Sequence, residues 1–173
     1  IEIPNLSKTE ETSDELLAAA DARDLLAYYR ESTRYHGTAW HALLEVLWHV
    51  GCRISGIRAL DLQDWDAERN VLEFRHRPPT RLKDASEHER NVAVPDPVAD
   101  ALDVWITRER PRKRDENGRE PLFATTHGRA STSTIRCWAY QATQPCLHAA
   151  CPHSRRRGTC EWTDRAVSSK PSG

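Results

Sequence analysis

The segment from Trp48 to Asp66, WHVGCRISGIRALDLQDWD, constrains the fold most, because it joins two apolar helical patterns through a short turn. The first helix is predicted by apolar residues that recur with helical spacing: Trp40, Leu43, Leu44, Leu47 and Trp48. Gly51 supplies the left-handed residue with which many helices end. We therefore expect Arg53 to lie just past a helix end. A short helix follows, and its apolar stripe consists of Ile54, Ile57 and Leu60.

Alternation of apolar and polar residues predicts two strands after this segment. The alternating positions are Leu72, Phe74 and His76 in the first strand and Val92 and Val94 in the second. A hairpin with a long loop, from about Arg77 to Glu89, fits this pattern.

Three further helices are predicted from capping residues and apolar spacing. Their expected limits are the capping box of Thr12 and Glu15 to about Glu31, the N-cap Asp96 and first helical residue Pro97 to about Ile106, and Ser131 to Pro145. The polar segment 111–121, with proline at each end, is expected to be an exposed connection. The sequence therefore predicts a mixed α+β fold, mainly α, with helices packed around a small antiparallel β-hairpin.

Length and composition set the broad class of protein. The 173 residues contain no linker-like Gly/Ser tract, which indicates one domain, or part of one, over residues 1–173. No apolar run approaches the roughly 20 residues needed to cross a bilayer, and no leader pattern opens the chain, so we expect a cytoplasmic protein without a membrane partner. Five cysteines, an odd number, favour reduced thiols over a disulfide framework. An Ile1 start without any Met suggests a processed product, an excised domain or an incomplete reading frame.

The net charge of −1 hides a separation of charge along the chain. Residues 1–74 contain 7 Lys/Arg and 14 Asp/Glu, whereas residues 75–173 contain 18 and 12, so the two parts carry −7 and +6. Clustered cations are typical of a surface that binds nucleic-acid phosphates. The alternative is an ordinary solvated set of charges in a chain whose 21 Arg against 4 Lys reflect genome composition.

The Trp48–Asp66 segment and the hairpin after it resemble the opening of the catalytic domain of tyrosine recombinases, the phage-integrase family. In that family the first catalytic arginine lies in this segment and the catalytic lysine in the hairpin, at positions that match Arg53 and Lys83. The later stretches PLFAT (121–125) and GRASTSTIR (128–136) look most like the integrase-type recombinases of halophilic archaea.

The resemblance implies site-specific DNA recombination or integration, in which DNA is cut and rejoined through a covalent phosphotyrosine without a metal or a high-energy cofactor. It implies double-stranded DNA as partner and self-association of the full-length protein on DNA. The arginines that we assign as DNA-binding candidates are Arg77, Arg81, Arg90, Arg129 and Arg136.

The assigned side chains suit the chemistry that the resemblance implies. The planar guanidinium of Arg53 can donate two parallel hydrogen bonds to the phosphate oxygens on which charge develops. The ammonium of Lys83 can deliver a proton to the leaving 5′ oxygen. The alternatives are an ordinary helix-terminal arginine and a solvated lysine. Many family members also have an acidic residue three positions after the arginine, where this chain has Gly56.

Three later elements of the family are not convincingly present: a His-x-x-Arg box, a following His or Trp, and the nucleophilic Tyr. The sequence from His153 to Arg156 matches the box by letter only, because no apolar helix follows it. We therefore expect the N-terminal part of a catalytic domain, inactive alone. The alternative is a catalytically inactive DNA-binding remnant of a recombinase.

A cysteine-rich stretch supports a third class, a zinc-binding regulator. Its candidate ligands are Cys146, Cys151, His153 and Cys160, with His148 in competition. Their spacing is irregular and lacks paired C-x-x-C knuckles, so a flexible basic loop with free thiols is the alternative to structural zinc.

Overall fold

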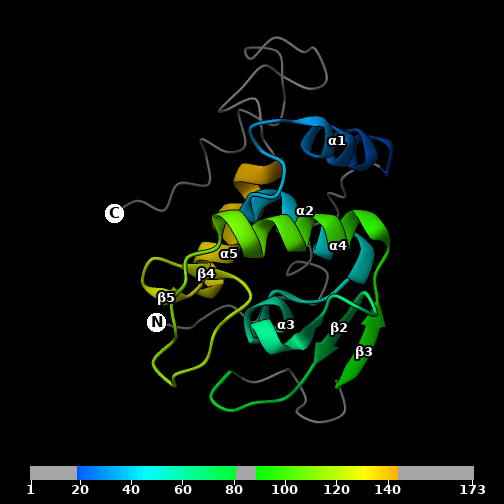
Figure 1. The fold of residues 1–173 in the computed structure, drawn as a ribbon. Coiled ribbons are helices and arrows are strands. Elements are labelled where there is room, and N and C mark those ends of the chain that lie inside the picture. The colour runs from blue at the N-terminus through cyan, green and yellow to red at the C-terminus, as the bar shows by residue number, and fades with distance from the viewer. Residues whose placement is uncertain (1–18, 81–88, 144–173) are drawn as a thin grey trace, which may run out of the picture.

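The structure is a computed structural model that describes residues 19–80 and 89–143 (Figure 1). Predictions on other residues, including the Thr12 capping box and the end of the last helix, lie outside the described residues. The helical elements are α1 (Ala19–Glu31), α2 (Ala39–Val50), α3 (Ile54–Ala59), η1 (Leu62–Asp64), α4 (Asp96–Val104), η3 (Trp105–Glu109) and α5 (Thr132–Thr143). The strands are β1 (Trp65–Asp66), β2 (Val71–Phe74), β3 (Arg90–Ala93), β4 (Ala124–Thr125) and β5 (Gly128–Arg129).

Helix α2 ends at the predicted glycine. The hydroxyl oxygen of Thr38, the N-cap, accepts a hydrogen bond from the backbone N–H of His41 at 3.4 Å. At the other end Gly51 has a left-handed backbone, with φ at 59°, and its N–H bonds the carbonyl of Leu47. The chain then turns, and Arg53 is the N-cap of α3. The predicted order of helix, glycine turn, arginine and short helix is confirmed.

The predicted hairpin is confirmed as β2 and β3, which are antiparallel and pair Leu72 with Val92. Strand β2 ends at Phe74, before the predicted limit at His76. The backbone N–H of His76 bonds the Glu89 side chain at 2.7 Å, so it does not join the strand ladder. A third strand, β1, pairs with the other edge of β2. Strand β1 has only 2 residues, too few to show alternation in the sequence.

Helix α4 begins one residue earlier than predicted. Asp96 is its first helical residue, because the extended Pro95 occupies the N-cap position. From Trp105 onward the helix widens into the π-helical turn η3, which closes with the Arg110 N–H bonded to the Trp105 carbonyl at 2.8 Å. The indole N–H of Trp105 is held at 2.9 Å by the backbone carbonyl of Leu122. Tertiary contact of this kind is not visible in local sequence spacing.

Helix α2 is central, and it packs against α1, α4 and α5. The main core unites α2, α3, β2, α4 and α5, and its large, fully buried members are Leu43, Ile57, Leu60, Leu72, Phe74, Leu102, Leu122, Phe123 and Ile135. A second apolar cluster joins α1 to α2 and α5: Leu25, Leu26, Tyr29, Tyr35, Leu44 and Ala142. Figure 1 shows α1 at one end of the molecule and the β2–β3 hairpin at the other. The predicted mixed α+β class is confirmed. Within the described ranges, no helix has the length and apolar character needed to cross a membrane.

Candidate nucleic-acid interface

Arg53 lies where the sequence predicts, at the turn between α2 and α3. Its backbone carbonyl accepts the first α3 hydrogen bonds, from Gly56 at 2.9 Å and Ile57 at 3.2 Å. Its side chain is exposed and makes no hydrogen bond or ion pair with the residues that the structure describes. Burial therefore does not oppose a charge at this position, and the five guanidinium N–H groups are free to meet an anion.

Arg90, on the far strand of the hairpin, lies near Phe74 and Cys52. Its guanidinium carbon stands 4.6 Å from the ring centre of the buried Phe74. Burial raises the pKa of the Cys52 thiol to about 11, and the positive charge of Arg90 acts against that rise. Arg90 is thus near Cys52, the chain neighbour of Arg53. The exposed Arg90 side chain supports the prediction of an interface here, without testing it.

Gly56 occupies the position at which many tyrosine recombinases have an acidic residue, and the structure shows what surrounds it. A Cβ atom at Gly56 would lie 3.4 Å from Cε1 of Phe74 and 3.7 Å from the Cβ of Cys52. Helix α3 therefore approaches strand β2 closely at Gly56 and Phe74.

Arg77 is engaged inside the protein. Its guanidinium donates two hydrogen bonds to the Asp64 carboxylate, at 2.7 and 2.6 Å, and a third nitrogen–oxygen contact reaches Asp61 at 3.6 Å. The hydrogen bonds with Asp64 raise the pKa of Arg77 above its ordinary value. DNA contact by Arg77 stays a prediction, and it competes with this intramolecular role.

Arg129 is the most enclosed of the candidate arginines that the structure describes, with 5% of its side chain exposed. It forms ion pairs with Asp61 and, at 2.8 Å, with Asp115. It also donates hydrogen bonds to the backbone carbonyls of Arg58 and Leu60 at 2.7 and 3.2 Å. All three guanidinium nitrogens are used, so the geometry shows a side chain that joins β5 to the end of α3. Its predicted DNA contact is not supported by this placement.

Arg136 lies on α5 and is exposed, next to the fully buried Ile135. Helix α5 packs against α2 and α3. Arg136 makes no side-chain hydrogen bond or ion pair within the part of the chain that the structure describes. The remaining candidates, Lys83 and Arg81, lie outside the described residues, as do the cysteines of the predicted zinc site. Among the described residues, no group of three or more His, Cys, Asp or Glu side chains is arranged to hold a metal ion.

Sequence reasoning missed the ion pairs that enclose Arg77 and Arg129. Their anions come from the acidic corner after α3 and from Asp115, and a further cation, Arg119, comes from the segment predicted to be an exposed connection. The partners are far apart in the chain, with 68 positions between Arg129 and Asp61. Local periodicity cannot reveal such pairs. The one local signal was the spacing of Asp61 and Asp64, which form a capping box around η1.

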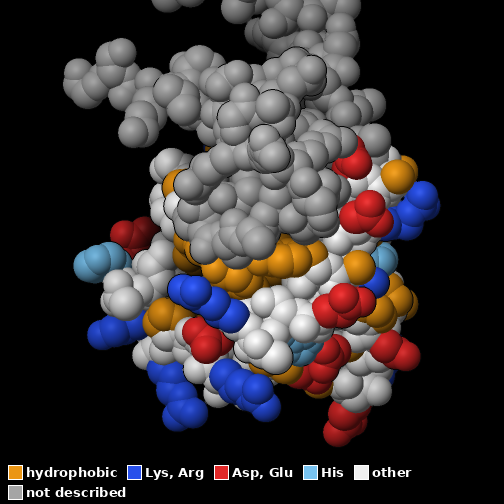
Figure 2. Space-filling model, turned by 90° about the horizontal axis from the view of Figure 1, so that it is seen from above, with side chains coloured by type: hydrophobic (Ala, Val, Ile, Leu, Met, Phe, Trp, Pro, Cys, Tyr) orange, Lys and Arg blue, Asp and Glu red, His pale blue; other side chains and the backbone are white. Residues whose placement is uncertain are grey.

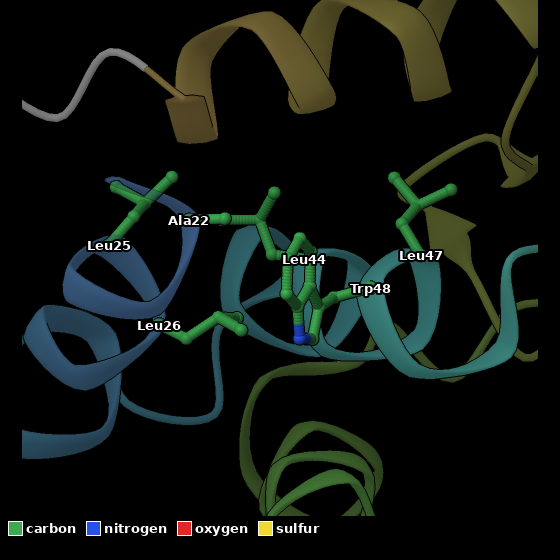
Figure 3. A pocket seen from close by; sticks show the side chains of 6 residues that line it. All are labelled: Ala22, Leu25, Leu26, Leu44, Leu47 and Trp48. Carbon is green, nitrogen blue, oxygen red and sulfur yellow. The ribbon is translucent and has the colours of Figure 1, made fainter. Parts of the chain in front are cut away.

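A different surface feature is an apolar pocket between α1 and α2, of about 200 Å³ (Figure 3). Its lining consists of Ala22, Leu25, Leu26, Leu44, Leu47 and Trp48. Trp48 is 44% exposed at its edge. Hydrocarbon walls suit an apolar side chain and offer nothing to a phosphate group. Hydrophobic side chains are also visible on the face shown in Figure 2, where most Lys and Arg side chains lie to one side and most Asp and Glu to the other.

Comparison with known proteins identifies the fold but not a family. No protein-family model matches the sequence, and no curated protein matches it. Among solved structures, XerA recombinase is similar with a TM-score of 0.53 and 20% identity over 91% of this chain and 52% of that one. The Tn1549 transposon integrase in complex with circular intermediate DNA is similar with a TM-score of 0.59 and 15% identity, over 91% of this chain and 54% of that one. The same integrase in complex with transposon right end DNA has a TM-score of 0.52 and 14% identity, over 92% of this chain and 66% of that one.

These likenesses define the class to which the fold belongs. The chain has the mixed α+β fold seen in recombinase and integrase structures, and it spans about half the length of the first two chains that it matches. At identities of 20% and below, the similarity is one of fold. Exposed arginines stand at the N-cap of α3, Arg53, on β3, Arg90, and on α5, Arg136.

Proposed function

We propose that this chain is part of a tyrosine-recombinase catalytic domain that binds double-stranded DNA in site-specific recombination or integration. One observation carries the proposal: within the recombinase-type fold, Arg53 stands at the predicted helix corner, exposed and without an intramolecular partner among the described residues. The hairpin that carries Lys83 is packed against the same corner through Gly56 and Phe74.

In the proposed mechanism Arg53 binds the nonbridging oxygens of the scissile phosphate and stabilises the charge that develops there. Arg90, whose charge already reaches Cys52, adds to the positive potential. Lys83 on the β2–β3 loop gives its proton to the leaving 5′ oxygen. The fork of Arg53 and the single ammonium of Lys83 serve different steps, so neither side chain can replace the other.

The covalent step needs a tyrosine. Of the four described tyrosines, Tyr140 lies within helix α5 with 68% exposure, and the other three pack together. Tyr29 is buried, its hydroxyl donates to the Ala142 carbonyl at 3.0 Å, and burial raises its pKa. Tyr28 and Tyr35 pack against it, with ring centres 5.5 and 6.2 Å away. We therefore propose that this chain does not catalyse recombination alone and that the nucleophile comes from a longer protein. The alternative is an inactive DNA-binding remnant.

Two finer parts of the proposal rest on the resemblance in sequence: an origin among the integrases of halophilic archaea and self-association of the full-length protein on DNA. A third, a cytoplasmic location, rests on the lack of an apolar run long enough to cross a bilayer. In two of the similar structures the Tn1549 integrase is in complex with DNA.

The first test is the Arg53→Ala substitution with Arg69→Ala as matched control. Arg69 has 67% of its side chain exposed and lies between β1 and β2, at the end of β2 opposite the β2–β3 loop. Binding to a short mixed-sequence duplex is measured by fluorescence anisotropy over a series of salt concentrations. We expect the log–log salt slope to fall by about 1 for Arg53→Ala and to stay unchanged for Arg69→Ala, because each lost phosphate contact removes about 0.9 from the slope.

Two results would contradict the proposal. Native binding that is absent or independent of salt would exclude a phosphate interface, and equal slopes for the two variants would exclude Arg53 from it. In a longer protein that contains the nucleophile, Arg53→Ala should abolish covalent trapping of cleaved DNA while circular dichroism shows an intact fold. If the longer native protein binds DNA without trapping it, the remnant hypothesis replaces catalysis.

A further inference from the structure

The segment that leads out of η3, residues 108–114, concentrates positive charge. Five cations stand against one carboxylate, Glu109, so this basic segment has a net charge of +4. All of the cations except Arg110 are exposed. The exposed members are Arg108, Arg112, Lys113 and Arg114. None of them belongs to the site around Arg53.

The exposed cations of the basic segment are not neutralised inside the protein. Within the part of the chain that the structure describes, the side chains of Arg108, Arg112 and Lys113 make no hydrogen bond or ion pair. Arg114 approaches Glu120 at 3.8 Å, and the two side chains are 67% and 49% exposed. An exposed pair at this distance is held weakly, so another anion can replace the carboxylate.

Arg110, the buried member, fixes the base of the segment. It is 7% exposed, and its Nε donates to the backbone carbonyl of Pro121 at 2.9 Å, which ties together the two ends of the connection 111–120. Its Nη2 is buried without a hydrogen-bond partner among the described residues. Burial lowers the pKa of Arg110, and the charge of Glu120 acts against that fall. An arginine stays charged in a protein, so Arg110 adds to the positive potential of the exposed cations.

Asp115, directly after the exposed cations, fixes the other end of the segment. Its carboxylate accepts a hydrogen bond from Arg129 at 2.8 Å and two more from backbone N–H groups of the turn that follows, at 2.9 and 3.0 Å. Strand β5 lies against this anchor, because a Cβ atom at Gly128 would be 2.9 Å from the carbonyl oxygen of Arg114. The cations at 112–114 therefore stand between two fixed points, which lowers the entropy lost when they bind.

The same anchor places the basic segment beside α3. Arg129, which binds Asp115, also donates to the backbone carbonyl of Arg58 at 2.7 Å, near the end of α3 opposite Arg53. Helix α3 has 6 residues, so its two ends are about 9 Å apart. Duplex DNA carries one phosphate charge for about every 1.7 Å of its axis, so a duplex that meets Arg53 has further phosphates at this distance. Figure 1 shows the connection as a loop next to β4 and β5, away from α1.

We propose that the exposed cations of the basic segment bind the backbone of the same DNA duplex, at phosphates other than the one that Arg53 meets. The inference rests on the proposed function and deepens it with a second contact surface. Contacts to phosphates position a protein on DNA and carry no sequence information, so this surface adds affinity and not specificity. Pro111 is the only apolar side chain of the segment, whereas protein–protein interfaces are built around apolar and aromatic anchors. A nucleic-acid backbone therefore fits the segment better than an acidic protein does.

The test removes two charges that have no structural partner. The double variant Arg112→Gln/Lys113→Gln leaves the anchors at Arg110 and Asp115 intact. The charge-matched control is Arg23→Gln/Arg69→Gln, which removes two exposed cations from α1 and from the turn between β1 and β2. Each single variant of the segment is also made, so that the result does not depend on the folding of the double variant. Thermal unfolding shows that each protein is folded.

Binding of the full chain to a mixed-sequence duplex is measured by fluorescence anisotropy over a series of salt concentrations. We expect the log–log salt slope to fall by about 2 for the double variant and by about 1 for each single variant, because each phosphate contact contributes about 0.9. The control should retain the native slope. Adding Arg53→Ala to the double variant should lower the slope by about 3, since separate contacts in one complex add.

The outcomes separate the inference from the function on which it rests. If Arg53→Ala lowers the slope but the double variant keeps the native slope, the second surface is excluded and the proposed function stands. If the native chain shows no salt-dependent binding, both fall. Equal losses for the double variant and the control would reduce the effect to net charge and overturn the inference.

Two other results would also overturn it. If the triple variant loses no more slope than the double variant, Arg53 and the basic segment do not hold the same duplex. If the cations instead bind the acidic part of a second copy of the chain, the double variant changes the mass in sedimentation equilibrium without DNA and leaves the salt slope as it is.

Discussion

Replacing Arg30 with methionine tests the most enclosed carboxylate of the described residues, Glu45. Glu45, on α2, is 0% exposed, and the Arg30 guanidinium from α1 binds both its oxygens, at 2.6 and 2.9 Å. His41 and His49, one turn on either side, also approach the carboxylate, at 3.4 and 3.3 Å. Methionine keeps the apolar stem of Arg30 and removes the two hydrogen bonds. The Arg30→Met variant therefore leaves a buried carboxylate without its principal partner.

The magnitude follows from these contacts. Two hydrogen bonds to a charged group contribute about 1.5 to 3 kcal/mol each. Because 37% of the Arg30 side chain is exposed, water can replace part of the hydrogen bonding to Glu45 in the variant. We expect Arg30→Met to lower the free energy of unfolding by about 3 kcal/mol, at the lower end of the cost of breaking a buried ion pair.

The loss of unfolding free energy in Arg30→Met should depend on pH. Burial alone would raise the pKa of Glu45, but the close approach of His41 and the hydrogen bonds from Arg30 outweigh burial and hold it below the ordinary value of 4.5. A carboxyl group whose pKa is lower in the folded chain contributes stability that is complete above its unfolded pKa and is lost as the pH falls through the folded pKa. The difference between native protein and Arg30→Met should therefore be full at neutral pH and shrink at a pH below 4.5.

Urea unfolding followed by circular dichroism measures these free energies, with Arg69→Met as control. The Arg69 ion pair with Asp66 spans 3.6 Å at the surface, so its loss should cost less than about 1 kcal/mol. Equal losses for the two variants, or a difference for Arg30→Met that persists unchanged in acid, would refute the assigned role of the Glu45 carboxylate.

Two further predictions concern a glycine and the cysteines. Gly37→Ala should destabilise the fold by about 2 to 5 kcal/mol, because φ is +71° and a Cβ would lie 2.1 Å from Cγ1 of Val104. The control is Gly118→Ala, where φ is +73° but the added Cβ meets open space, and its cost should be only about 1 kcal/mol. Thermal unfolding measures both losses. Alkylation at pH about 8, mapped by mass spectrometry, should modify the exposed Cys137 at least about tenfold faster than Cys52, whose pKa burial raises to about 11. Equal rates would contradict a raised pKa for the Cys52 thiol.

Elements with a local signal were predictable from the sequence. Helix α2 carries a full apolar stripe and a glycine stop, so its end at Val50 followed from Gly51 alone. Strands β1, β4 and β5 have 2 residues each, and no periodicity can be read from so short a segment. The π-helical turn at Trp105 was also invisible, because tertiary contact with Leu122 accompanies it.

The candidate site was likewise predictable only in part from the sequence. Arg53 was predictable because the residues on both sides specify the turn that it occupies. Nothing in the sequence distinguishes the exposed Arg90 and Arg136 from the enclosed Arg77 and Arg129. That distinction depends on carboxylates that only the fold brings near. A pattern of arginines can therefore indicate a basic surface while leaving open which guanidinium groups face outward.

Ion pairs inside the protein change the meaning of the charge separation along the chain. Six side chains pair with one another: Asp61, Asp64, Asp115, Arg77, Arg119 and Arg129. Asp61 and Asp64 come from the acidic part, residues 1–74, and the other four from the basic part. Setting these six aside reduces the −7 and +6 of the two parts to −5 and +4. The positive charge available to DNA is thus smaller than the sequence suggests. The salt slope of binding should accordingly depend on the exposed basic residues and not on the total count of basic residues.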